Sequence, residues 1–311
     1  MIRLTKSGEE NEMMIQLIAT AQSVAQAEAL MLAGADRLIV GESTYGLRHK
    51  GDWSLSAVRE VTALAHRYGK EVTVAVNNLM HNDQIVSLPD YLSALKTIGV
   101  DSVTAGDPGA ISLIRKANIP YWYDAQTLVT SARQIQFWAK REAIGAVVAR
   151  EVTLTELNQI QRQLGLPIEV QVYGPTCIHH SKRPLVTNYF NELGRNESGE
   201  MREYYISEPN DETSRYPIYE DANGTHVFSE DLTLMAQLPE LFRNELHTWK
   251  LDGWHAGERF VEIVALFSQA RSHLLNAKFD RIEMERRLAE LQPEPFRLGT
   301  GLLLRNPEEI K

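Results

Sequence analysis

The chain is poor in cysteine, which excludes several kinds of site. Cys177 is the only cysteine among its 311 residues. A single thiol can form neither an internal disulfide nor a cysteine-rich metal site. A chain without disulfides fits a reducing compartment, so we expect a cytoplasmic location.

Long apolar runs and an excess of positive charge are also missing. No run approaches the roughly 20 apolar residues that a membrane-spanning helix needs, and the opening MIRLTKSGEENEMM is too polar for a signal peptide. We therefore expect no membrane association. Lys and Arg total 32 against 41 Asp and Glu, which gives a formal net charge of −9. Such a chain has no general attraction for nucleic acid, so contact with RNA requires a local basic patch or a partner.

Two catalytic motifs and a metal site are absent from the sequence pattern. No Gly-rich phosphate loop follows the first predicted strand, and no GxSxG nucleophile elbow occurs. His179 and His180 are adjacent, so their side chains point in different directions in most backbones. Because a zinc site needs three or four convergent ligands, we expect no metal.

What the chain does contain is a repeated alternation of strands and helices. Short apolar runs predict strands at 15–20, 37–41, 71–76, 101–106, 121–125, 145–149, 167–173 and 248–253. Helices are predicted at 23–35, 54–68, near 88–98, and at 109–117, 131–141, 153–164 and 256–276. Continuous apolar runs are typical of parallel strands buried on both faces. We predict an α/β fold, an eight-stranded parallel β/α (TIM-like) barrel, with an open doubly wound sheet as the less favoured alternative.

The alternation is interrupted between the seventh and eighth strands. The inserted segment 174–247 contains a predicted hairpin at 216–229, turning at Ala222-Asn223-Gly224, and a short helix at 238–245. We expect this insertion to cover one end of the barrel. We assign residues 1–279 to the barrel domain, and expect 280–311, a helix and a final extended segment, to pack on its outside.

Polar residues follow the predicted strands, where barrel proteins place their functional groups. The candidate catalytic residues are Glu42, Asp124, Arg150, Glu151, His179 and Asp252. The candidate substrate-binding residues near the strand ends are Tyr45, Arg48, Asn77, His81, Tyr173 and Lys250. Arg48, Arg150 and Lys250 predict an anionic substrate such as a small dicarboxylate, because guanidinium forks match carboxylates and phosphates. The alternative is that these charges only neutralise one another.

The segment CIHHSKRPLVTNYF (177–190) is the densest cluster of polar and aromatic residues, and we interpret it as a long loop. Its candidate binding residues are Ser181, Lys182, Arg183, Asn188, Tyr189 and Phe190. Basic groups beside aromatic rings grip phosphate and stack on bases, although a solvated loop would have the same composition. Cys177 is either a nucleophile with a histidine partner or, as we expect, a small packed hydrophobe. His226 either reaches the site or packs.

Several long motifs resemble one known family. The runs GADRLIVGESTYGLR, VAVNNLMHND, VVAREVTL, EVQVYGPTCIHHSKRPLVTNYF, YPIYEDANGTHVFSEDLTLMAQLPEL and WKLDG are similar to the collagenase-like peptidase family, U32. The resemblance implies a barrel protein that is either a peptidase or a component of a hydroxylation reaction. Its tRNA branch implies prephenate as a co-substrate and 5-hydroxyuridine at the wobble position as the product.

The chain departs from this family at the positions that bind an iron–sulfur cluster. Many members hold a four-iron cluster on four cysteines, but here only Cys177 matches, with Pro184 and Thr233 at two other positions and no cysteine near Met201. One thiolate cannot hold such a cluster, so we expect no cofactor. Where the family has an Arg after its Lys-x-x-Gly motif, this chain has Trp254.

The short length and the SKRPLVTNYF segment look most like the short Bacillus-type members, which have a longer, cysteine-bearing paralogue. The resemblance therefore implies tRNA and that paralogue as partners, with tRNA bound in their complex. Three functions stay open: a tRNA-hydroxylation protein, a peptidase, and a non-catalytic partner subunit.

Overall fold

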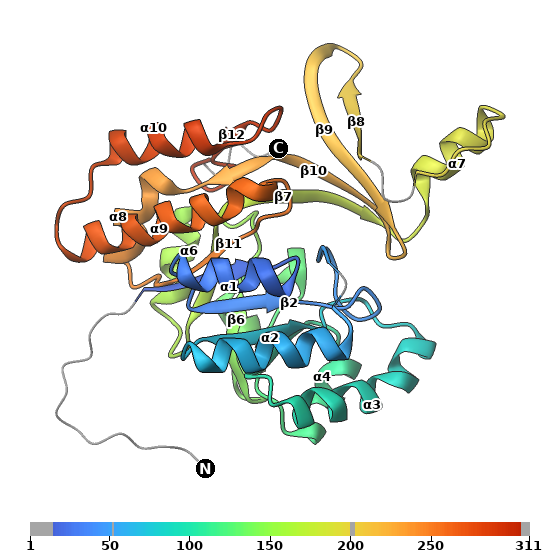
Figure 1. The fold of residues 1–311 in the computed structure, drawn as a ribbon, viewed down its shortest axis with the longest axis horizontal. Helices are drawn as coiled ribbons and strands as arrows, with labels where there is room; N and C mark the ends of the chain where they lie inside the picture. The colour runs from blue at the N-terminus through green and yellow to red at the C-terminus, as the bar shows by residue number, and fades with distance from the viewer. Residues whose placement is uncertain (1–14, 52, 200–202, 306–311) are drawn as a thin grey trace.

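A closed barrel forms the centre of the molecule in the computed structural model, which describes residues 15–51, 53–199 and 203–305 (Figure 1). Its parallel strands are β1 Gln16–Thr20, β2 Arg37–Val40, β3 Glu71–Ala75, β4 Ser102–Ala105, β5 Tyr121–Tyr123, β6 Ala143–Val147, β7 Ile168–Ser181 and β11 Thr248–Leu251. β1 pairs with both β2 and β11, and β11 pairs with β7, so the ring closes without a free edge. The predicted TIM-like barrel is confirmed.

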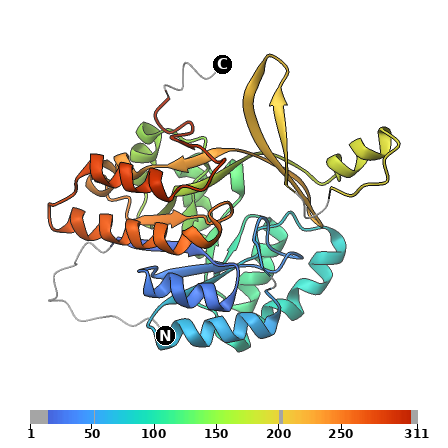
Figure 2. The same cartoon turned by 45° about the horizontal axis from the view of Figure 1, so that its top comes forward.

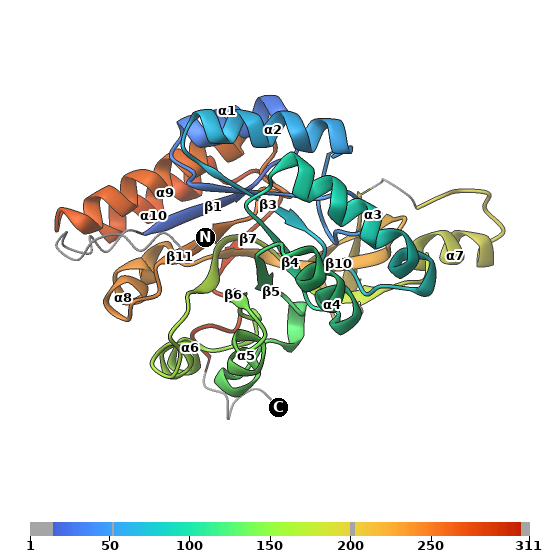
Figure 3. The same cartoon turned by 90° about the horizontal axis from the view of Figure 1, so that it is seen from below.

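Helices surround these strands on their outer face (Figure 3). They are α1 Val24–Leu32, α2 Leu55–Arg67, α3 Asn82–Ile98, α4 Pro108–Ala117, α5 Ala132–Ala139, α6 Leu154–Gln161 and α9 Phe260–Leu275, with 3-10 turns η1 Gln126–Leu128 and η3 Gly257–Arg259. Five of them begin at a Ser, Asp or Thr whose side chain accepts a hydrogen bond from a backbone N–H of the first turn. The main apolar core lies between strands and helices, because successive strand residues alternate faces.

One helix starts earlier than predicted. Pro89 lies inside α3, although a proline is typical of a helix start. The helix begins at Asn82 instead, because the side chain of Gln84 accepts a hydrogen bond from the backbone N–H of His81 over 3.0 Å.

The segment 177–190, interpreted above as a loop, is a strand followed by a helix. β7 continues past the barrel to Ser181, and α7 spans Leu185–Glu192. Gly174, with a φ of 107°, turns β7 out of the barrel. The prediction failed because the outer half of β7 pairs with a strand about 50 residues later, β10 Gly224–Thr233, and non-local pairing leaves no local pattern.

The insertion forms an arm that stands out from the barrel (Figures 1 and 2). β9 Asp211–Asp221 and β10 form the predicted hairpin, and Gly224 has the expected positive φ of 111°. β8 Glu203–Glu208, which the sequence did not reveal, pairs with β9. The insertion then returns to the barrel through η2 Met235–Gln237 and α8 Leu238–Arg243, close to the predicted short helix.

The C-terminal segment runs beside α9 and β10. α10 Arg281–Leu291 packs against α9 and η2, and the short β12 Leu298–Gly299 pairs with β10. Tyr173 donates a hydrogen bond of 2.7 Å to Gln292. His255 lies 2.7 Å from Asp231 and stacks on Phe296 with ring centroids 4.0 Å apart. In the described part of the chain, no helix has both the length and the apolar character needed to cross a bilayer.

Candidate active site at the barrel mouth

The barrel interior is closed near the N-terminal ends of its strands. Arg37 and Glu169 form an ion pair of 2.7 Å whose side chains are only 2% and 1% exposed. The Arg37 guanidinium also lies 3.9 Å from the ring centroid of Trp122. A small apolar cluster of Ile18, Ile39 and Ala75 is separate from the main core. A ligand therefore has access only from the opposite end, the barrel mouth.

Two carboxylates lie at this mouth in fixed positions. Asp124 accepts hydrogen bonds from Asn77 over 2.8 Å and from the Gln126 side chain over 3.0 Å. Asp252 accepts from the backbone N–H of Trp254 over 3.1 Å, and one of its oxygens lies 3.9 Å from the Lys250 ammonium. Because donors hold each group from the protein side, both are oriented before any ligand binds.

Arg48, Arg150 and Lys250 bring positive charge to the same place. Arg48 adopts a φ of 57°, unusual for a side chain with a Cβ. Burial lowers the pKa of Arg48, and the positive charge of Arg150 lowers it further. The negative charges of Cys177, Asp124 and Asp252 raise it, but by less than burial lowers it. Arg150 donates to the side chain of Gln171 over 2.6 Å.

Two polar atoms at the mouth have no hydrogen-bond partner among the described residues. They are Nδ1 of His49 and Oγ1 of Thr104, and both are buried. Burial, with the charge of nearby Lys250, lowers the pKa of His49 to about 4, so its ring is neutral at pH 7. Buried polar atoms are almost always hydrogen-bonded, so these two are available to a small polar ligand at the mouth.

A cleft of about 960 Å³ adjoins the mouth, between the β7–β10 ribbon, the arm and the C-terminal segment. Its lining contains four arginines, two glutamates and three aromatic rings. These residues are Arg150, Arg215, Arg297, Arg305, Glu151, Glu230, Tyr205, Tyr216 and Phe296. The cleft thus carries the local excess of positive charge that the chain as a whole lacks.

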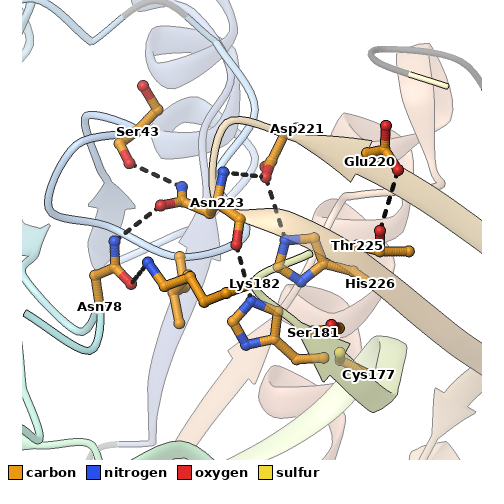
Figure 4. Close-up of polar contacts among 12 residues, drawn as sticks. Ser43, Asn78, Cys177, Ser181, Lys182, Glu220, Asp221, Asn223, Thr225 and His226 are labelled. Carbon is orange, nitrogen blue, oxygen red and sulfur yellow. Dashed lines mark hydrogen bonds and ion pairs between the residues drawn. The ribbon is translucent and has the colours of Figure 1, made fainter. Parts of the chain in front are cut away.

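The tip of the β9–β10 hairpin is fastened to the mouth (Figure 4). Asn223 donates to the backbone oxygen of Ser43 and accepts from Asn78, each over 2.8 Å. Lys182 donates to Asn78 over 3.3 Å, and His180 Nε2 lies 3.1 Å from the backbone oxygen of Asn223. These contacts hold the outer half of β7 beside the barrel opening.

The structure brings part of the predicted set together. Arg48, Asn77, Asp124, Arg150, Lys250 and Asp252 gather at the mouth. Glu42 accepts a hydrogen bond from Thr44 over 2.9 Å, and Glu151 lines the cleft. His179, Ser181, Lys182 and Arg183 lie on or just after the outer half of β7.

Other predicted residues lie away from this group. Tyr45 stacks on Tyr91 and hydrogen-bonds Ser87, and His81 is the N-cap residue of α3. Tyr173 is buried against Phe267. Asn188, Tyr189 and Phe190 belong to α7, in the projecting arm (Figure 1).

Within the arm, an apolar groove of about 840 Å³ lies between α7 and strands β8, β9 and β10. Tyr189 is 61% exposed beside it, whereas Phe190 is buried in a small cluster. The buried carboxylate of Glu220 fixes α7, because it accepts hydrogen bonds from the backbone N–H groups of Val186 and Thr187 over 2.9 and 3.3 Å.

Cys177 is not the packed residue that the sequence suggested. It is half-buried and lines the cleft, because Gly174 turns β7 away from the core. In the described part of the chain, no three His, Cys, Asp or Glu side chains converge in a way that would hold a metal ion. With one cysteine in the sequence, the donor set does not fit a four-thiolate cluster.

Sequence reasoning missed several residues of the site. His49 directly follows the predicted Arg48 but was not itself selected, and Gln171 lies within β7, before the predicted strand end. Arg215, Arg297 and Arg305 come from the arm and the C-terminal segment. The only signal for these three was their charge, which many surface residues share.

Comparisons with known proteins agree with the barrel and its motifs. The sequence model described as peptidase family U32 matches residues 22–311. The chain is 31% identical to tRNA hydroxylation protein P2 of Bacillus subtilis strain 168, over 93% of this chain and 97% of that protein. It is 25% identical to tRNA hydroxylation protein P1 of the same strain, over 80% of this chain and 61% of that protein.

A more distant relative modifies ribosomal RNA. The chain is 26% identical to the 23S rRNA 5-hydroxycytidine C2501 synthase of Escherichia coli K12, over 56% of this chain and 26% of that protein. Among solved structures, dihydrodipicolinate synthase superposes with a TM-score of 0.51 at 8% identity, covering 90% of this chain and 85% of that one. This last likeness shows the barrel fold alone.

Proposed function

Since this chain belongs to peptidase family U32, we propose that it acts in the hydroxylation of tRNA, with a wobble uridine as substrate and 5-hydroxyuridine as product. The observation that carries the proposal is the cleft lined by arginines and aromatic rings beside the barrel mouth. Arginines neutralise phosphates, and aromatic rings stack on unpaired bases. Two relatives named as tRNA hydroxylation proteins match most of the chain.

The mouth suits a second, small anionic ligand. Arg48, Arg150 and Lys250 provide the charge for carboxylates, and His49 and Thr104 provide buried polar atoms without partners. We propose a dicarboxylate such as prephenate as the co-substrate bound there. A neutral His49 accepts or donates one hydrogen bond without adding charge.

The proposed setting is the cytoplasm, with a longer cysteine-bearing relative as the partner. The cleft is basic, but the whole chain is acidic. Because long-range attraction follows the total charge, a partner that adds positive surface would raise the affinity for tRNA. We further propose that this chain holds no iron–sulfur cluster of its own.

Mass spectrometry of tRNA nucleosides from a strain that lacks the gene tests the proposal. We expect 5-hydroxyuridine to fall, the wild-type gene to restore it, and Arg150→Ala to restore less than about a tenth. Arg281→Ala is the control, because Arg281 is exposed on α10 and pairs with Glu285. Normal 5-hydroxyuridine in the deletion strain, with no redundant pathway, would refute the proposal.

A further inference from the structure

A β-bulge places three side chains on one face of the β7–β10 ribbon. Residues 177 and 180 would face opposite sides of a regular strand, since side chains alternate. Here Cys177 pairs with Phe228, and His180 pairs with His226, because a register shift leaves Ile178 as the extra residue. Cys177, His180 and His226 therefore share a face.

His226 lies between Asp221 and Cys177 (Figure 4). Its Nε2 is 3.3 Å from Asp221 Oδ1, and its ring stacks on His180 with centroids 4.5 Å apart. The His226 side chain is fully buried, and its Nδ1 has no hydrogen-bond partner among the described residues. An ionised carboxylate only accepts hydrogen bonds, so Asp221 keeps the proton on Nε2 and leaves the Nδ1 lone pair facing Cys177.

The charges around this pair favour proton transfer from sulfur to nitrogen. Burial alone raises the pKa of Cys177, but His226, Arg48 and Arg150 outweigh it and lower the pKa below 9.0. Burial alone lowers the pKa of His226, but Asp221 and Cys177 outweigh it and raise the pKa above 6.5. The thiol donates at present to the backbone oxygen of His179 over 3.3 Å.

We propose that Cys177 is a nucleophile, with His226 as its base and Asp221 as the residue that orients the base, and that its target is carbon C6 of a uracil ring. The arrangement of nucleophile, base and orienting carboxylate is the one that activates side chains for covalent catalysis. Cys177 and Arg150 both line the basic, aromatic cleft, so a nucleobase bound there contacts the Cys177 sulfur. This inference rests on the proposed function and deepens it.

The step is balanced without any oxidant. His226 takes the thiol proton, and the thiolate forms a bond from sulfur to C6. The π pair of the C5–C6 double bond moves through C4 onto O4, where Arg48 or Arg150 stabilises the negative charge. A proton from solvent adds at C5. The reverse step removes a proton from C5, restores the double bond and releases the thiolate. The adduct makes C5 nucleophilic, which substitution by an electrophile at C5 requires.

The test is hydrogen exchange at C5 in heavy water. The full-length chain is incubated in heavy water with an unmodified tRNA transcript that has a wobble uridine, once without and once with the longer relative. The tRNA is then digested, and mass spectrometry measures the mass of each nucleoside. We expect the wobble uridine to gain about one mass unit, from the single hydrogen on C5. Cys177→Ala should reduce this exchange at least about 100-fold, and His66→Gln, which changes an exposed histidine outside the cleft lining, should not. Gel-shift binding of the same tRNA shows that each variant folds.

A second readout follows the sulfur itself. Because Cys177 is the only cysteine, alkylation by iodoacetamide reports on it alone. The alkylation rate is measured as a function of pH, and its midpoint reports the pKa of the thiol. We expect this midpoint to lie below 9.0, the ordinary thiol value, and to be higher in Asp221→Asn than in the wild type. A structural cysteine would show neither effect.

The outcomes separate the two proposals. Two outcomes overturn the proposal that Cys177 is a nucleophile: equal exchange by wild type and Cys177→Ala, or tRNA binding without exchange in any mixture. In either case the proposed function stands if Cys177→Ala still restores 5-hydroxyuridine in cells. Absence of tRNA binding together with normal 5-hydroxyuridine in the deletion strain overturns both. Cleavage of casein that Cys177→Ala abolishes would assign the thiolate to an acyl substrate and overturn the uracil target.

Discussion

At the scale of single residues, the barrel interior contains a buried ion pair at a place where apolar side chains could also pack. Arg37 on β2 and Glu169 on β7 meet inside the barrel, almost fully buried. A buried pair of this kind adds little stability compared with apolar residues of the same volume, but losing one partner leaves a charge without compensation. Together with Trp122, the pair closes the barrel below the mouth.

Single and double substitutions of this pair should differ in a characteristic way. We predict that Glu169→Gln lowers the free energy of unfolding by about 3–5 kcal/mol. The double variant Arg37→Met with Glu169→Leu should lose less, because no buried charge remains. Urea unfolding measures both. Glu142→Gln, which removes an exposed partner of Arg115, is the control and should change little. Equal losses in the single and double variants would contradict the prediction.

His49 makes stability depend on pH in a definite direction. Burial, with Lys250, lowers its pKa from 6.5 to about 4. Between these values the unfolded chain binds a proton that the folded chain does not, so the free energy of unfolding falls as the pH drops from about 6.5 to about 4. We predict that His49→Gln removes up to about 1.4 kcal/mol per pH unit of this dependence. Urea unfolding of the wild type and of His49→Gln across that range measures the slope, and equal slopes would contradict the prediction.

At the scale of elements, β7 decides where the arm and the cleft lie. Its first half belongs to the barrel, and its second half pairs with β10 outside it. The change of direction occurs at Gly174, where a Cβ atom would lie 2.1 Å from the backbone oxygen of Asp252. The same backbone contact links the bend to a carboxylate of the mouth.

Replacing this glycine should disturb the bend. We predict that Gly174→Ala lowers the free energy of unfolding by about 2 kcal/mol, because both the positive φ and the close approach oppose a side chain. It should also slow alkylation of Cys177, which follows the bend. Gly165→Ala is the matched control, since a Cβ there meets nothing within 4 Å. Equal stability of the two variants would show that the bend tolerates alanine.

At the scale of the whole molecule, the local charge of the cleft is opposite in sign to the net charge of the chain. The chain carries a net charge of −9, yet four arginines line one cleft. They come from the barrel, the arm and the C-terminal segment, so only the folded chain gathers them. Binding to RNA through this cleft must therefore depend on salt, because each neutralised phosphate releases counterions.

Salt dependence tests which arginines contact the backbone. We predict that Arg297→Gln and Arg305→Gln each weaken tRNA binding and each reduce the slope of log affinity against log salt by about one. Gel shifts at several salt concentrations, with the longer relative present, measure both quantities. Arg281→Gln, on the exposed face of α10, should leave the slope unchanged. A slope that none of the cleft variants alters would place the RNA elsewhere.

The sequence by itself determined the barrel, its helices, the hairpin and the family, because apolar periodicity, capping residues and turn chemistry act over a few neighbouring residues. It also indicated the strand ends where Asp124, Arg150 and Asp252 meet. Only the tertiary structure decided that 177–190 is strand and helix, that Arg215, Arg297 and Arg305 share a cleft, and that Cys177 faces His226. These depend on pairing between β7 and β10 and on one register shift. Such pairing is set by packing between distant segments, which leaves no local pattern to read.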